Sequence, residues 1–91
     1  MNQYLVERTL TGITPEALRG AAEGAKKTAA EFSARGTPVT YIRSTFVPEG
    51  DRCYCLFESE SESTVREVQE AAGIPFDRIV TAAFIVAEEL P

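Results

Sequence analysis

Apolar residues recur along the chain with two spacings, the two-residue repeat of strands and the 3.6-residue repeat of helices. The order in which these spacings follow one another is the feature that most constrains the fold. Strand-like runs occupy 3–10, 39–47, 52–58 and 77–88, the last of them apolar on both faces. Apolar residues at helical spacing separate the first strand from the second and the third from the fourth. The order β-α-β-β-α-β predicts the split βαβ arrangement of a ferredoxin-like α+β fold. All 91 residues fit one such domain.

Capping residues bound both predicted helices. The first begins after Thr14 with Pro15 in its first position, and Gly36 ends it. The serine- and glutamate-rich run 59–63 supplies caps and first-turn acids for the second, which ends at Gly73. Right-handed crossovers place both helices on one face of a four-stranded antiparallel sheet of order 4-1-3-2. The other face of the sheet is left open.

Cys53 and Cys55 are the only two cysteines of the chain. They stand one residue apart in a predicted strand, so both thiols point to the same face with Cβ atoms about 7 Å apart. A disulfide requires Cβ atoms about 3.5–4.5 Å apart, so the two cannot bridge each other without breaking the strand. Three interpretations remain open: packing as small apolar side chains, thiol redox chemistry and metal binding.

Alternation also assigns residues to the two faces of the sheet. The residues predicted beneath the helices are Tyr4, Val6, Leu10, Ile42, Phe46, Tyr54, Leu56, Val80, Phe84 and Val86. The open face is predicted to carry both thiols and Glu7, with Arg43 on the flanking strand. The apolar residues predicted on that face are Leu5, Tyr41, Phe57, Ile79 and Ile85. This much exposed apolar surface predicts a face-to-face homodimer.

Composition argues against several classes of function. The net charge of -5 disfavours nucleic acid and anionic membranes as partners, and no apolar stretch approaches a membrane span. Histidine, the commonest general base and metal ligand, is absent, and no catalytic constellation is visible. Two cysteines without a recognisable signal peptide predict a cytoplasmic protein.

Five runs spread over nearly the whole chain carry a family resemblance: Tyr4–Arg8, Tyr41–Glu49, Cys53–Glu58, Ser61–Glu67 and Ala72–Ile79. Through them the sequence resembles a family of small bacterial ferredoxin-like dimers of unknown function, one branch of which is described as nickel-binding and nickel-responsive. The resemblance implies a homodimer and, in that branch, ligands that include cysteine and histidine. The cysteine positions match, whereas this chain has no histidine.

The predicted placement of both thiols and Glu7 on the open face still allows a metal site. Cys53, Cys55 and Glu7 would form a thiolate–carboxylate site for nickel or another transition metal, such as zinc or copper(I). Without histidine, such a site is short of ligands unless water or the dimer partner completes it. The competing interpretation of Glu7 is an interfacial salt bridge to Arg43 or Arg8.

A second class of function is small-molecule binding or monooxygenase-like chemistry in a pocket without metal. Dimeric ferredoxin-like proteins often keep such a pocket between helices and sheet, although fold alone does not fix function. The aromatic residues available to line it are Tyr4, Tyr41, Phe46, Tyr54 and Phe84.

Overall fold

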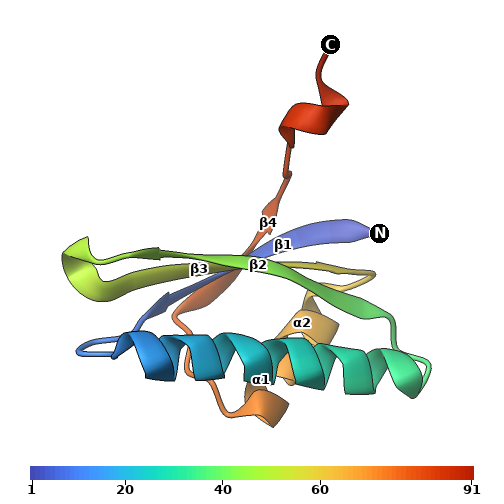
Figure 1. The fold of residues 1–91 in the computed structure, drawn as a ribbon. Coiled ribbons are helices and arrows are strands. Elements are labelled where there is room, and N and C mark those ends of the chain that lie inside the picture. The colour runs from blue at the N-terminus through green and yellow to red at the C-terminus, as the bar shows by residue number, and fades with distance from the viewer.

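The chain folds in the order β1-α1-β2-β3-α2-β4, and the computed structural model describes all 91 residues. The strands are β1 (Asn2–Thr9), β2 (Val39–Val47), β3 (Arg52–Ser59) and β4 (Arg78–Ala82). The helices are α1 (Pro15–Ala34) and α2 (Glu62–Ala72), with short 3₁₀ turns at Glu49–Asp51 and Ala87–Glu89. The antiparallel sheet order β2-β3-β1-β4 is the predicted order read from the other edge. The ferredoxin-like α+β fold is therefore confirmed (Figure 1).

The caps of both helices are those that the sequence predicts. The Thr14 side chain accepts a hydrogen bond from the amide of Ala17 at 3.1 Å, and Ser61 accepts one from Thr64 at 3.3 Å. Gly73 ends α2 with φ of 71°, a left-handed conformation that glycine adopts without steric cost. Neither helix is both long and apolar enough to cross a membrane.

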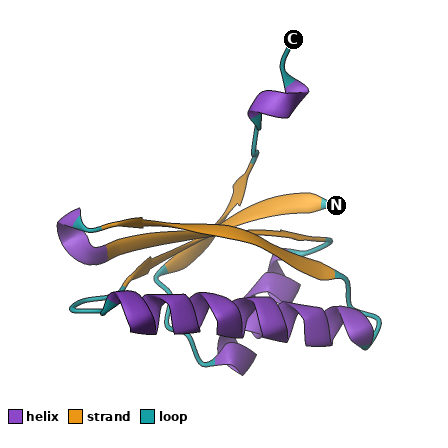
Figure 2. Ribbon diagram, viewed as in Figure 1, coloured by secondary structure: helices purple, strands orange, loops and turns teal.

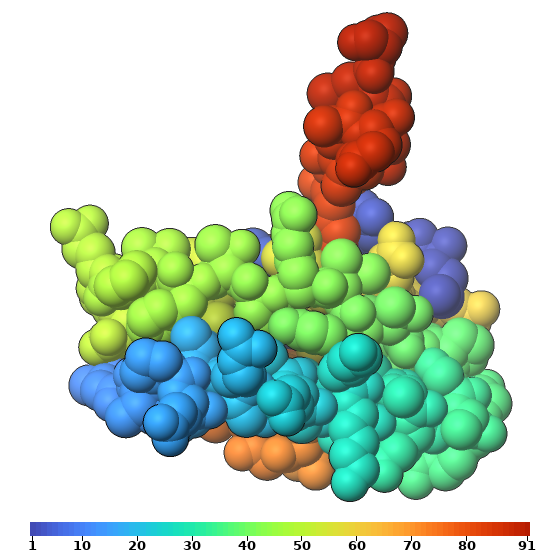
Figure 3. Space-filling view, viewed as in Figure 1, coloured from blue at the N-terminus to red at the C-terminus, as the bar shows by residue number.

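Both helices cover one face of the sheet, and the core lies between these layers (Figure 2). The opposite face carries no helix. On that side the residues after β4 rise away from the sheet as an isolated projection (Figure 3). This C-terminal arm, residues 83–91, exposes Ile85 and Leu90 by 71% and 60%.

The last strand is shorter than predicted, because β4 ends at Ala82 rather than continuing to 88. Its one neighbour in the sheet is β1, and Ala82 lies opposite Gln3 near the beginning of that strand. Beyond this point only Asn2 of β1 remains as a possible partner, and the chain leaves the sheet. Phe84 and Val86, predicted as inward residues of the strand, belong to the arm instead.

Pairing with β1 corrects the predicted faces of β3. Cys55 lies opposite Val6 and Phe57 opposite Tyr4, and directly opposed residues share a face. Because Val6 and Tyr4 lie beneath the helices as predicted, both cysteines and Phe57 lie there too. Their predicted position on the open face is wrong. Tyr54 and Leu56, predicted inward, occupy the open face with their β1 partners Glu7 and Leu5.

The predicted faces of β4 are also reversed. Ile79 lies opposite Val6 and is buried beneath the helices, whereas Val80 lies opposite Leu5 on the open face. The strand is apolar on both faces, so its own sequence does not distinguish them.

A bulge in β2 explains why the predicted faces of the sheet are wrong for some residues of this strand and correct for others. Tyr41 lies opposite Phe57 and Arg43 opposite Leu56, so Ile42 is an extra residue without a partner. Tyr41 consequently lies beneath the helices, and Ile42 is 41% exposed; both predictions were wrong. Beyond the bulge, Arg43 on the open face is as predicted. The inward position predicted for Phe46, which packs against the core, is confirmed as well.

Candidate functional site

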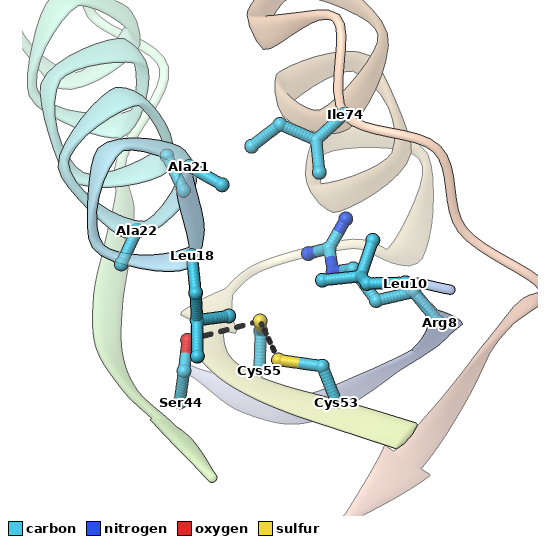
Figure 4. Close-up of a pocket in the computed structure, with 10 residues that line it drawn as sticks. Arg8, Leu10, Leu18, Ala21, Ala22, Ser44, Cys53, Cys55 and Ile74 are labelled. Atoms are coloured by element: carbon cyan, nitrogen blue, oxygen red, sulfur yellow. Dashed lines mark hydrogen bonds between the residues drawn. The ribbon is translucent and has the colours of Figure 1, made fainter. Parts of the chain in front are cut away.

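A chain of polar side chains runs through the apolar layer beneath the helices. Cys53 Sγ and Cys55 Sγ lie 3.8 Å apart, and Cys55 Sγ lies 3.0 Å from the hydroxyl oxygen of Ser44 (Figure 4). The Ser44 hydroxyl in turn hydrogen-bonds the Tyr41 hydroxyl at 2.7 Å. Both thiols are free and buried, with exposures of 1% and 5%. The β2 bulge makes this chain possible, because it turns Tyr41 and Ser44, three residues apart, to one face.

The two thiols and Ser44 line a small internal pocket, together with Arg8. Its apolar wall is formed by Leu10, Leu18, Ala21, Ala22, Ala25 and Ile74. The cavity volume of about 10 Å³ is room for about one water molecule or one ion. An organic ligand of ordinary size needs a cavity of about 300 Å³ or more, so this pocket excludes one.

A surface groove of about 380 Å³ between α1 and β2 adjoins this pocket. Leu18, Ala22 and Ser44 line both spaces, so these three side chains form the wall between them.

Burial keeps the thiol of Cys53 protonated at neutral pH. Burial first, and then charge repulsion from and hydrogen bonding with Cys55, raise the pKa of Cys53 from an ordinary 9.0 to about 12, although Arg8 acts in the opposite direction. The pKa of Tyr41 is also raised, first by burial, although the hydrogen bond from Ser44 opposes that shift. A thiol with so high a pKa is a poor nucleophile, which disfavours the redox interpretation.

The structure does not bring Glu7 to the thiols. Glu7 lies on the open face, where its carboxylate accepts a hydrogen bond from Arg78 Nε at 2.9 Å and lies 3.8 Å from Arg52. Glu7 therefore does form salt bridges, but with these two arginines rather than with Arg43 or Arg8. No group of three or more cysteine, aspartate or glutamate side chains in the chain is placed to hold a metal ion.

Arg8, next to Glu7 in sequence, points the opposite way, into the thiol pocket. Its side chain donates hydrogen bonds to the carbonyl of Pro75 at 3.1 Å and to Gln69 Oε1 at 2.8 Å. The sequence carried a signal for this position, since Arg8 alternates with Tyr4 and Val6 on the inward side of its strand. For Ser44 there was no comparable signal, because the bulge that orients it depends on pairing with β3.

The sulfur separation fits a metal chelate. Two thiolates each about 2.3 Å from one ion, at a tetrahedral angle, lie about 3.8 Å apart, and the two sulfurs are 3.8 Å apart. The donors within reach are two sulfurs and the Ser44 hydroxyl. This set suits a soft, thiophilic ion and lacks the imidazole that nickel sites commonly use.

The aromatic pocket predicted as an alternative is not assembled as one site. Tyr41 and Phe46 line the groove between α1 and β2, but Tyr4 lies in the core and Tyr54 on the open face. Phe84 belongs to the C-terminal arm, where its amide donates a hydrogen bond to Gln3 Oε1.

Fold and site together define a small ferredoxin-like α+β protein with a buried pair of thiols in a pocket of one-ion size. Residues 4–81 match the model of the SCO4226-like family, described as nickel responsive proteins, and the chain belongs to this family. It is also similar to the crystal structure of SCO4226 from Streptomyces coelicolor A3(2), with 22% identity and a TM-score of 0.77. The match covers 92% of this chain and 99% of that one. No curated protein matches the sequence.

Proposed function

We propose that this protein binds a thiophilic transition metal ion through Cys53 and Cys55, in the pocket beneath α1. The observation that carries the proposal is the separation of 3.8 Å between two free, buried sulfurs in a cavity of about 10 Å³. Membership of a family described as nickel responsive supports a metal-related role. Two thiols that must stay reduced also fit the cytoplasm.

The site would serve binding rather than catalysis. A metal must displace the protons of both thiols, and burial makes the proton of Cys53 hard to remove, so affinity should rise with pH. The Ser44 hydroxyl is positioned as a third donor, and its own hydrogen bond with Tyr41 would orient it.

The test is metal titration of the reduced protein beside a Cys53→Ser/Cys55→Ser variant. We expect stoichiometric binding of one ion per chain in the wild type and loss of that binding in the variant. Glu7→Gln is the matched control, because it alters a predicted ligand that the fold places on the other face. Equal metal affinity in the wild type and the double cysteine variant would overturn the proposal, and a large loss in Glu7→Gln would restore Glu7 as a ligand.

We also propose that the open face of the sheet pairs with a second copy of the chain. Three observations support this homodimer: the face has no helix, it carries Leu5, Leu56 and Val80, and the C-terminal arm projects on the same side. The exposed Ile85 and Leu90 of the arm would then pack against the partner. Sedimentation at micromolar concentration should give a dimer, with weaker association after removal of residues 84–91. A monomer at that concentration would contradict it.

A further inference from the structure

The thiol pocket contains a buried positive charge that has no counter-charge. Arg8 is 2% exposed and lines the pocket beside Cys53 and Cys55. Both acceptors of its hydrogen bonds, the Pro75 carbonyl and the Gln69 side-chain amide, are neutral. No carboxylate oxygen lies within 4.0 Å of its guanidinium nitrogens, since the three salt bridges of the protein involve Glu7 and Glu62 with other arginines. Burying an unpaired charge is costly. A bound ion and its thiolate ligands should therefore together balance the positive charge of Arg8.

The charge of Arg8 decides which ion leaves the filled pocket neutral. Two thiolates contribute two negative charges and the guanidinium one positive charge, because arginine stays protonated in proteins. A divalent ion would leave a net positive charge in a low-dielectric interior, whereas a monovalent ion would leave none. Net charge in such surroundings is strongly unfavourable.

The donor set favours the same ion. Thiolates suit copper(I) as well as zinc, but copper(I) is satisfied by three ligands. Two sulfurs and the Ser44 hydroxyl would hold it with an S–metal–S angle close to the one that the 3.8 Å separation fits. A divalent ion such as zinc takes four ligands in structural sites, but the pocket offers two sulfurs and one hydroxyl. Nickel(II) meets the same shortage, and no histidine is present to relieve it.

On the basis of the proposed metal-binding function, we infer that the Cys53–Cys55 site takes a monovalent thiophilic ion, copper(I) or silver(I), with Arg8 as its counter-charge. On binding, the two S–H bonds break, two sulfur–metal bonds form and two protons leave to solvent, with no change of oxidation state. Arg8 touches no metal in this arrangement. It acts through the net charge of the pocket.

Two substitutions test the charge by independent routes. Arg8→Met removes the guanidinium and keeps most of its volume. Gln69→Glu leaves Arg8 in place and puts a carboxylate where the amide oxygen now lies, 2.8 Å from the guanidinium. Each lowers the pocket's charge by one unit. The control, Arg43→Met, makes the same change on the open face, and circular dichroism checks the fold of all three.

The experiment is anaerobic competition titration with chelators of known affinity, using silver(I), copper(I), zinc(II) and nickel(II) as probes. We expect the wild type to bind the monovalent ions more tightly. In Arg8→Met and Gln69→Glu the ratio of monovalent to divalent affinity should fall by about tenfold or more, and in Arg43→Met it should stay as in the wild type.

Failure of the inference and failure of the proposed function give different results. A wild type that prefers a divalent ion, or an unchanged ratio in whichever pocket variant folds, overturns the monovalent inference and leaves metal binding intact. A wild type that binds none of the four ions through its cysteines overturns both. If Arg8→Met does not fold, the affinity ratio of the isosteric Gln69→Glu variant alone tests the monovalent inference.

Discussion

Glu7 and Arg8 are neighbours in sequence, yet the two faces of the sheet treat their charges differently. Glu7, on the open face, is 7% exposed and has two arginine partners that are themselves largely in solvent. Arg8, beneath the helices, has neutral hydrogen-bond partners and two thiols for neighbours. The charge of Glu7 is already balanced by arginines, whereas the buried charge of Arg8 has no opposite charge beside it. This difference is the reason why the proposed metal site lies on the helix-covered face.

The largest effect that distinguishes the two faces should come from their apolar residues. Phe57→Ala, in the fully buried position beneath the helices, is expected to lower the free energy of unfolding by about 3–5 kcal/mol. Leu56→Ala, next along β3 but on the open face, should cost about 2 kcal/mol. Urea unfolding of both variants at several protein concentrations measures this. Because the proposed dimer covers the open face, the cost of Leu56→Ala should increase with protein concentration, whereas that of Phe57→Ala should not. A Leu56→Ala cost that is independent of concentration would contradict the dimer.

Alkaline pH should weaken the helix-covered face through Cys53. Its pKa is raised from 9.0 to about 12, so the folded state holds a proton that the unfolded state releases above pH 9. This contribution to stability is complete below pH 9 and is lost as the pH rises toward 12, by at most about 1.4 kcal/mol for each pH unit.

The comparison that isolates this effect is the wild type against Cys53→Ala, unfolded with urea from pH 8 upward. Tyr41, whose pKa is shifted in the same direction, is present in both proteins. Most of its contribution cancels, because burial is the largest cause of its shift and Cys53 only a minor one. Parallel stability profiles for the two proteins would mean that Cys53 does not titrate differently on unfolding.

The smallest effect concerns two adjacent hydroxyl residues of β2. Ser44→Ala removes a partner from both Cys55 and the Tyr41 hydroxyl, and should cost about 1 kcal/mol. Thr45→Ala, exposed on the open face, should change stability by less than about 0.5 kcal/mol. Urea unfolding compares them, with ultraviolet titration of tyrosine as a second readout. Equal costs would contradict the orientation of Ser44 toward the thiols.

Much of the architecture followed from the chain alone. Helical spacing bounded by Thr14 and Gly36 predicted α1, and the serine-rich run before Val65 predicted α2, because caps and amphipathic periodicity are local properties. The order of the elements then restricted the sheet to one topology. The inward side of β1 was also predictable, since Tyr4, Val6 and Leu10 contrast with Glu7 and Thr9 on the other side.

For β2, β3 and β4, the local sequence did not determine which residues lie beneath the helices and which lie on the open face. The run from Cys53 to Phe57 is apolar on both sides, so only its pairing with β1, Val6 against Cys55, turned the thiols beneath the helices. The bulge at Ile42 arises from pairing with β3 and brings Ser44 to Cys55. The sequence by itself determined the elements, their order and two thiols on one face. Tertiary structure decided which face, because register is a relation between strands and one residue of slip exchanges the two sides of a sheet.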